Sequence, residues 1–115
     1  MQRPHYNLDV WKLAVDLVAD IYVVTGTFPR DERFGLVSQM RRSAVSVPSN
    51  IAEGAARSSK KEFANFLSVA RGSLSELDTQ IIVSTRMGLM PEAADLTSKI
   101  ERIFAMLNAM ITRFR

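Results

Sequence analysis

Apolar residues recur every three or four positions through four long segments of the chain, and this period limits the fold more than any other feature. Such spacing places apolar side chains on one face of an α-helix, whereas a half-buried strand alternates at every second position. No sustained two-residue alternation with turn dipeptides occurs in the sequence. The sequence therefore predicts an all-α protein with four helices.

The first predicted helix covers residues 8–25, and the second starts near residues 32–36 and runs to about residue 56. Gly26 is the expected C-cap of the first helix, because glycine readily adopts the conformations that end helices. Pro48 lies inside the second helix, where it removes one backbone hydrogen bond and crowds the carbonyl of Ala44, so we expect a kink. Five apolar residues keep one face across this proline, which favours one kinked helix over two separate ones: Leu36, Met40, Ala44, Val47 and Ile51.

The last two predicted helices have readable start and stop signals. Ser59 and Glu62 fit a capping box at the start of the third helix, and Gly88 is expected to end it. Pro91 is expected in the first turn of the fourth helix, where its missing N–H is harmless. Short connections make neighbouring helices antiparallel. The simplest arrangement is an up-down-up-down antiparallel four-helix bundle, forming a single domain over residues 1–115.

The composition excludes several kinds of site. The chain has no cysteine and one histidine, His5, which excludes disulfides, thiolate zinc sites, thiol catalysis and most histidine-based triads. It also lacks a glycine-rich phosphate loop, a nucleophile elbow and the Glu-x-x-His pairs of di-iron bundles. We therefore expect no enzymatic activity, no metal, no cofactor and no small-molecule substrate.

The apolar runs are short. None approaches the roughly 18 residues of a membrane span, and the first dozen residues lack the apolar stretch of a signal peptide. We therefore expect a cytoplasmic protein that makes no membrane contact.

Fifteen basic and twelve acidic residues give a net charge of +3 and a pI near 9.7. This mild excess permits a nucleic-acid partner without requiring one. The phosphates of RNA or DNA are the candidate ligands of six cations: Arg41, Arg42, Arg57, Lys60, Lys61 and Arg71. Aromatic residues do not interleave with these cations, which disfavours a binder that stacks single-stranded bases. The alternative interpretation of the same residues is solvated helix surface and ordinary ion pairs.

One face of the second predicted helix is polar and unusually small. At 100° per residue this face contains Ser38, Arg42, Ser46, Ser49, Glu53 and Arg57, with Gln39 and Asn50 beside it. Small side chains let another backbone or a phosphate chain approach closely. In the structural interpretation, Arg42 and Glu53 pair with other helices or subunits, and Ser46, Ser49 and Asn50 satisfy the backbone at the kink. In the functional one, Arg41 and Arg42 bind a phosphate or an acidic partner.

The run from Gln39 to Gly54, together with shorter segments between Val10 and Leu89, carries a family resemblance. The shorter segments are Val10–Ala14, Ile21–Tyr22, Phe28–Pro29, Glu32–Leu36 and Phe66–Leu77. The chain resembles the 23S rRNA-intervening-sequence proteins, which were first noticed in reading frames inside intervening sequences of bacterial large ribosomal RNA genes and are sometimes labelled ribosomal proteins.

The resemblance implies a four-helix bundle that often assembles into a cyclic homopentamer. A related branch is the accessory protein of diversity-generating retroelements, a basic pentameric barrel that is thought to bind nucleic acid and a reverse transcriptase. The resemblance also implies a signature or interface role, without an active site, for a group of positions. These are Arg41, Arg42, Ser46, Pro48, Ser49, Asn50, Glu53 and Gly54.

Two main hypotheses follow. In the first, the protein is a non-enzymatic homo-oligomer that binds RNA, DNA or a ribonucleoprotein through the six cations. In the second, it is a protein-assembly or adaptor module with no nucleic-acid binding, and the small polar face is a subunit interface. A hydrolase that uses Glu53 is a remote third option.

Overall fold

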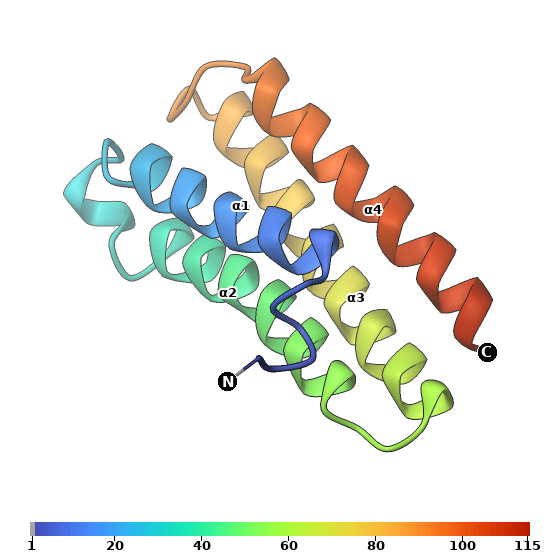
Figure 1. The fold of residues 1–115 in the computed structure, drawn as a ribbon. Coiled ribbons are helices and arrows are strands. Elements are labelled where there is room, and N and C mark those ends of the chain that lie inside the picture. Colours follow the sequence, from blue (N-terminus) through green and yellow to red (C-terminus); the bar gives the residue numbers. More distant parts are fainter. Residues whose placement is uncertain (1) are drawn as a thin grey trace.

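The computed structural model describes residues 2–115, and these residues form four α-helices and one short 3-10 helix without any strand (Figure 1). The elements are, in chain order, α1 (Asp9–Thr25), the 3-10 helix η1 (Arg30–Glu32), α2 (Leu36–Ala55), α3 (Lys60–Arg86) and α4 (Ala94–Phe114). The predicted all-α class and the number of helices are confirmed.

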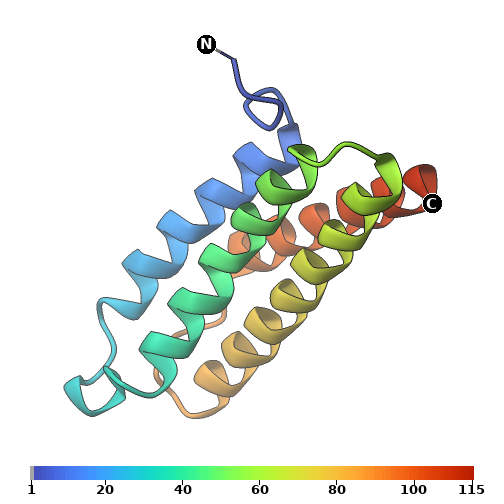
Figure 2. The same cartoon turned by 90° about the horizontal axis from the view of Figure 1, so that it is seen from below.

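The helices form an antiparallel bundle in which each packs against its neighbours. α2 lies between α1 and α3, and α4 packs on α3 and α1, while the Cα atoms of the diagonal pairs stay more than 8 Å apart. The molecule measures 43 × 26 × 19 Å. Figures 1 and 2 show that the two chain ends and the α2–α3 connection lie at one end of the bundle. The α1–α2 and α3–α4 connections lie at the other, as the predicted up-down-up-down order requires.

The apolar stripes of the four helices meet in one core. Among its fully buried side chains are Leu17, Ile21, Met40, Ile51, Leu67, Leu74, Leu77, Ile103, Leu107 and Ile111. Each buried Leu or Ile contributes about 1.5–3 kcal/mol relative to an exposed one. Burial of these stripes is therefore what holds the four helices in place.

Both ends of α3 follow the predicted signals. The Glu62 N–H donates to Ser59 Oγ at 3.1 Å, and Ser59 Oγ donates to Glu62 Oε2 at 3.2 Å, so the Ser59 cap is confirmed. At the other end Gly88 has φ +74°, and the Leu89 N–H donates to the Ser84 carbonyl at 2.9 Å. This hydrogen bond across a left-handed glycine ends α3 sharply.

The start of α4 corrects one prediction. α4 begins at Ala94 with Ala93 as its N-cap, so Pro91 lies in the connection and not in the first helical turn. The connection is longer because Met90 turns inward and is 6% exposed, and because Ala93 is extended, with φ −130° and ψ 92°. Packing of this loop therefore overrides the local preference of proline for a first helical turn.

α2 continues through Pro48, which is buried, so the prediction of one helix rather than two is confirmed. The kink itself stays a prediction. Asn50 Nδ2 donates to the Ser46 carbonyl at 2.8 Å and lies 3.0 Å from Ser46 Oγ. Asn50 thus serves a backbone carbonyl near the proline, as expected, although this carbonyl belongs to Ser46 and not to Ala44.

Candidate nucleic-acid interface

The structure divides the six predicted cations among three places. Arg57, Lys60 and Lys61 lie together at the α2–α3 connection. Arg41 and Arg42 lie in the first half of α2, toward the opposite end of the bundle, and Arg71 lies in the middle of α3. A continuous patch of all six is therefore absent from a single subunit.

The end of α4 adds cations to the group at the α2–α3 connection. Lys60 Nζ lies 4.5 Å from the centre of the Phe114 ring, and this ring lies 5.0 Å from that of Phe63. These contacts bring Arg113 and Arg115, on either side of Phe114, close to the start of α3. The up-down-up-down order places the start of α3 and the end of α4 at the same end of the bundle, so the sequence contained a signal for this neighbourhood.

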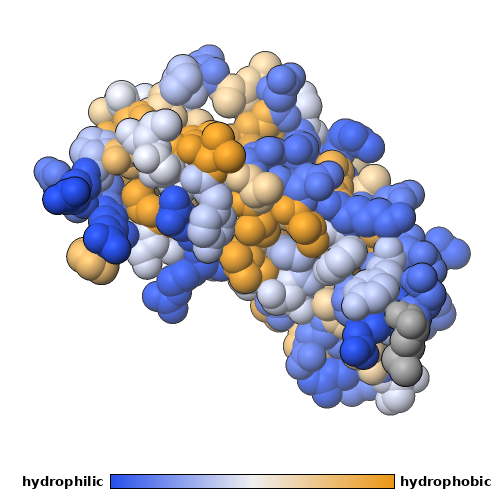
Figure 3. Space-filling view, turned by 60° about the vertical axis from the view of Figure 1, so that its left-hand side comes forward, coloured by the Kyte–Doolittle hydropathy of each residue, from blue (hydrophilic) through white to orange (hydrophobic). Residues whose placement is uncertain are grey.

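We call this end of the bundle the basic end. It contains seven exposed cations, namely Arg3, Lys12, Arg57, Lys60, Lys61, Arg113 and Arg115. It also contains three acids: Asp9, Glu53 and Glu62. The rest of the chain has eight of the fifteen basic residues and nine of the twelve acidic ones. The positive charge of the protein is therefore concentrated at the basic end, which Figure 3 shows as a mostly hydrophilic surface at lower right.

Local contacts hold two of these cations on the surface. Arg57 Nη2 lies 3.0 Å from Glu53 Oε1, its guanidinium carbon lies 4.7 Å from the centre of the Phe66 ring, and its side chain is 42% exposed. Lys60 is held over Phe114 in the same manner. Exposed ion pairs contribute little to stability. Here the ion pair and the two ring contacts position Arg57 and Lys60 while leaving both cations accessible to an anion. The N-terminus of α3 adds a favourable dipole.

Arg41 and Arg71 instead join helices within the bundle. Arg41 Nε donates to Thr25 Oγ1 at 3.0 Å, Nη2 donates to the Tyr22 carbonyl at 3.4 Å, and the guanidinium lies 4.3 Å from the centre of the Tyr22 ring. Arg71 Nη1 donates to Asn108 Oδ1 at 2.8 Å, linking α3 to α4. Both arginines therefore have partners on a neighbouring helix, which the sequence did not predict for either residue.

Replacing Arg41 with alanine is expected to lower the free energy of unfolding by about 1–2 kcal/mol, because charge-assisted hydrogen bonds and a cation–π contact are lost. Arg41→Lys keeps the charge but not the planar fork of donors, so it should recover less than half of the loss. Urea unfolding measures both variants. Wild-type stability in Arg41→Ala would show that these contacts do not link α1 to α2.

Gly54 has a clear packing role among the signature positions. A Cβ atom there would lie 2.8 Å from Phe63 Cδ1 and 2.8 Å from Phe66 Cβ. Only glycine therefore allows the end of α2 to approach the start of α3 this closely. The helix-breaking tendency of glycine is outweighed here by packing.

The remaining signature positions follow the exposed side of α2. Ser46 Oγ shares a 2.8 Å hydrogen bond with Ser73 Oγ, which links α2 to α3. Ser49 and Glu53 are exposed, and they continue the same face from Ser46 to the basic end.

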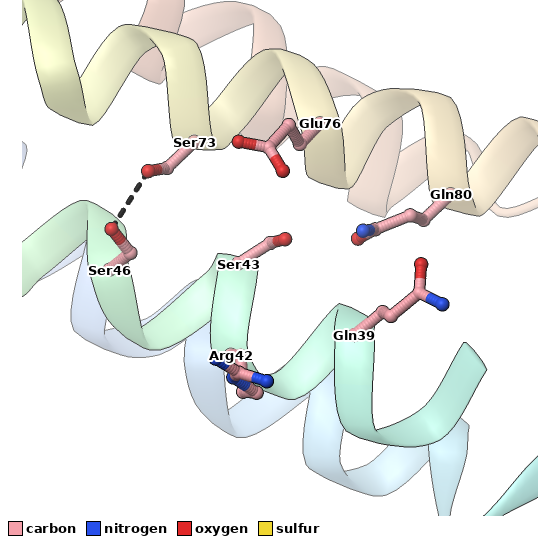
Figure 4. A pocket seen from close by; sticks show the side chains of 7 residues that line it. All are labelled: Gln39, Arg42, Ser43, Ser46, Ser73, Glu76 and Gln80. Atoms are coloured by element: carbon pink, nitrogen blue, oxygen red, sulfur yellow. Dashed lines mark hydrogen bonds between the residues drawn. The ribbon is translucent and has the colours of Figure 1, made fainter. Parts of the chain in front are cut away.

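A polar groove lies between α2 and α3, next to the Ser46–Ser73 contact. Its volume is about 350 Å³, and its walls are Gln39, Arg42, Ser43 and Ser46 from α2 and Ser73, Glu76 and Gln80 from α3. Figure 4 shows Gln39, Ser43 and Ser46 of α2 opposite Gln80, Glu76 and Ser73 of α3, while the Arg42 side chain lies at the outer edge of α2. The groove offers hydroxyl, amide, guanidinium and carboxylate groups, and we call it the α2–α3 groove.

Other chemical features are few. Within residues 2–115, no group of three or more His, Asp and Glu side chains is placed to hold a metal ion. His5 packs edge-on against Tyr6 and Trp11, with ring centres 4.9 Å apart in both pairs. No helix of this described part is long and apolar enough to cross a membrane.

Comparison with known proteins identifies the family. The family model described as "23S rRNA-intervening sequence protein" matches residues 6–109, which is most of the chain and includes all four helices to within a few residues. No curated protein matches the chain. The match includes the run from Gln39 to Gly54 and both walls of the α2–α3 groove. The chain therefore belongs to the 23S rRNA-intervening sequence protein family.

Proposed function

We propose that this protein is a non-enzymatic, cytoplasmic, self-associating helical bundle that binds RNA or DNA, free or in a ribonucleoprotein, through its basic end. The concentration of seven exposed cations and only three acids at that end carries the proposal. Lys and Arg side chains bind nucleic acid by neutralising phosphates and releasing their counterions, which needs no sequence recognition.

The basic end is wide enough to contact a short stretch of the phosphate backbone of a nucleic acid. The bundle measures 26 × 19 Å across its long axis. At 3.4 Å per nucleotide along one strand of a duplex, the wider dimension corresponds to about eight base pairs. Several phosphates can therefore contact one basic end at the same time.

Exposed apolar side chains support self-association. Phe34 is 88% exposed, Val23 74%, Met87 57% and Val69 52%, and Figure 3 shows orange side chains gathered on the middle of the face it presents. In a closed ring of identical subunits, such as the homopentamer that the family resemblance implies, every basic end lies on the same rim. A nucleic acid that crosses the rim then contacts several basic ends, and its affinity rises through multivalency.

The same apolar side chains favour one alternative, a protein-assembly module with no nucleic-acid binding. Fluorescence anisotropy with structured RNA, duplex DNA and single strands, titrated with salt, separates the two. We expect micromolar binding that weakens as salt rises, with a slope of log K against log salt of about −3 to −5.

Light scattering on the same samples gives the mass of the assembly. An oligomer that binds no nucleic acid at low salt would establish the assembly module. A monomer that binds would remove self-association from the proposal and leave the basic end in place.

A further inference from the structure

The α2–α3 groove contains polar groups that the chain itself does not satisfy. Gln80 Oε1 is buried and has no hydrogen-bond partner within the described residues. Ser43 is only 9% exposed. In Figure 4 its hydroxyl points into the groove and makes no hydrogen bond to the other six side chains drawn. Buried polar groups normally have partners, and Gln80 Oε1 lacks one. The Ser43 hydroxyl is open to the groove and is free to bond a ligand there.

Two charges of opposite sign line the groove, one on each helix. Arg42 belongs to α2 and Glu76 to α3, and both are exposed. The ion pairs among residues 2–115 are Arg57 with Glu53 and Lys99 with Asp20, so neither charge of the groove is neutralised by a salt bridge. A matching ligand has hydrogen-bond acceptors on one side and donors on the other.

We propose that the α2–α3 groove binds a guanine base. Guanine presents the acceptors O6 and N7 on one edge, which arginine binds in a bidentate manner. Its adjacent edge carries the donors N1–H and N2–H₂, which suit the two oxygens of a carboxylate. Arg42 binds the first edge and Glu76 the second, while Ser43 Oγ and, after a rotation of its side chain, Gln80 Oε1 take the remaining polar contacts.

The other bases fit this pair of charges less well. Adenine places the lone pair of N1 toward the carboxylate beside a single amino group, and uracil offers one N–H donor between two carbonyls. Cytosine has one amino donor and no N–H on its ring edge. The lining of the groove contains no aromatic ring, so selection comes from the base edges and not from stacking.

The groove is continuous with the basic end along α2. Ser46, Ser49 and Glu53 lead from the groove to Arg57 on the exposed side of this helix. Arg42 and Arg57 are about 22 Å apart along the helix axis at 1.5 Å per residue. A single strand whose phosphates contact the basic end therefore reaches the groove within a few nucleotides. Binding of a guanine within such a strand rests on the proposed function, because the strand must also contact the basic end. Binding of a free guanine nucleotide requires only the groove.

Anisotropy with two labelled oligouridine RNAs tests this inference, one with a single guanosine and the other with adenosine at the same position. The full-length protein is expected to bind the guanosine strand about tenfold more tightly. Glu76→Gln should remove the preference, because its amide accepts at only one atom, and should change binding of the adenosine strand no more than a control with the same change of charge. Glu101→Gln on the exposed side of α4 is the matched control and should keep the preference.

GMP and AMP titrations of the same proteins distinguish the two sources of guanine. Salt-dependent binding of both strands without preference, together with no GMP binding, would overturn the guanine site and leave the proposed function standing. GMP binding that Glu76→Gln abolishes, with no strand bound, would support a free-nucleotide site and overturn the proposed function. Absence of binding to every strand and to GMP would overturn both.

Discussion

Replacing Gly54 with alanine is expected to lower the melting temperature of the protein by about 10 °C, which corresponds to a loss of roughly 2 kcal/mol. The new Cβ would lie 2.8 Å from Phe66 Cβ and 3.1 Å from the Phe63 carbonyl oxygen. Neither atom can move by a side-chain rotation, so the start of α3 has to shift. Alanine favours a helix over glycine by up to about 1 kcal/mol, and the clash outweighs this gain.

Gly72→Ala is the matched control, because Gly72 also lies inside a helix but its Cβ would meet nothing within 4 Å. This variant is expected to gain about 0.5–1 kcal/mol from helix propensity alone. Thermal unfolding by circular dichroism measures both variants. A Gly54→Ala protein as stable as Gly72→Ala would show that α2 and α3 do not approach closely at this position.

Removing three cations from the basic end is expected to weaken nucleic-acid binding at least about 30-fold near 0.1 M salt, because about three phosphate contacts are lost. The variant is Arg57→Ala, Lys60→Ala and Lys61→Ala. All three side chains are exposed, and the hydrophobic core remains intact, so the variant should fold. Anisotropy at fixed salt measures the loss.

The matched control removes three exposed arginines that lie outside the basic end, Arg30, Arg86 and Arg102. Its net charge equals that of the first variant, so a general effect of charge would weaken both equally. We expect the control to bind within about threefold of the wild type, since none of its substitutions removes a phosphate contact. Equal weakening of the two variants would show that the distribution of charge does not matter.

Local signals in the sequence were enough to predict most of the fold. The apolar stripes define the four helices, and Ser59 and Gly88 act on residues within one turn of themselves, so their roles can be read without a structure. Pro91 was misplaced because Met90, beside it, packs into the core. A preference for the first helical turn could not predict that contact between distant parts of the chain.

The candidate sites were harder to predict because they depend on which helices meet. Arg113 and Arg115 reach the basic end because the end of α4 packs on the start of α3, where Phe114 meets Phe63, a residue far away in the sequence. Arg41 was predicted as a phosphate ligand, and its contact with Tyr22 becomes visible only once α2 is seen packed on α1. The role of Gly54 needs the same knowledge, because its neighbours belong to α3.

The salt dependence of binding tests the role of the basic end most directly. The slope of log K against log salt counts the phosphates that the protein neutralises. Measured for the wild type and for the two triple variants, the slope should become shallower by about 2–3 when Arg57, Lys60 and Lys61 are removed. It should stay unchanged in the control that removes Arg30, Arg86 and Arg102. The same slope in all three proteins would show that nucleic acid, if bound, does not contact the basic end.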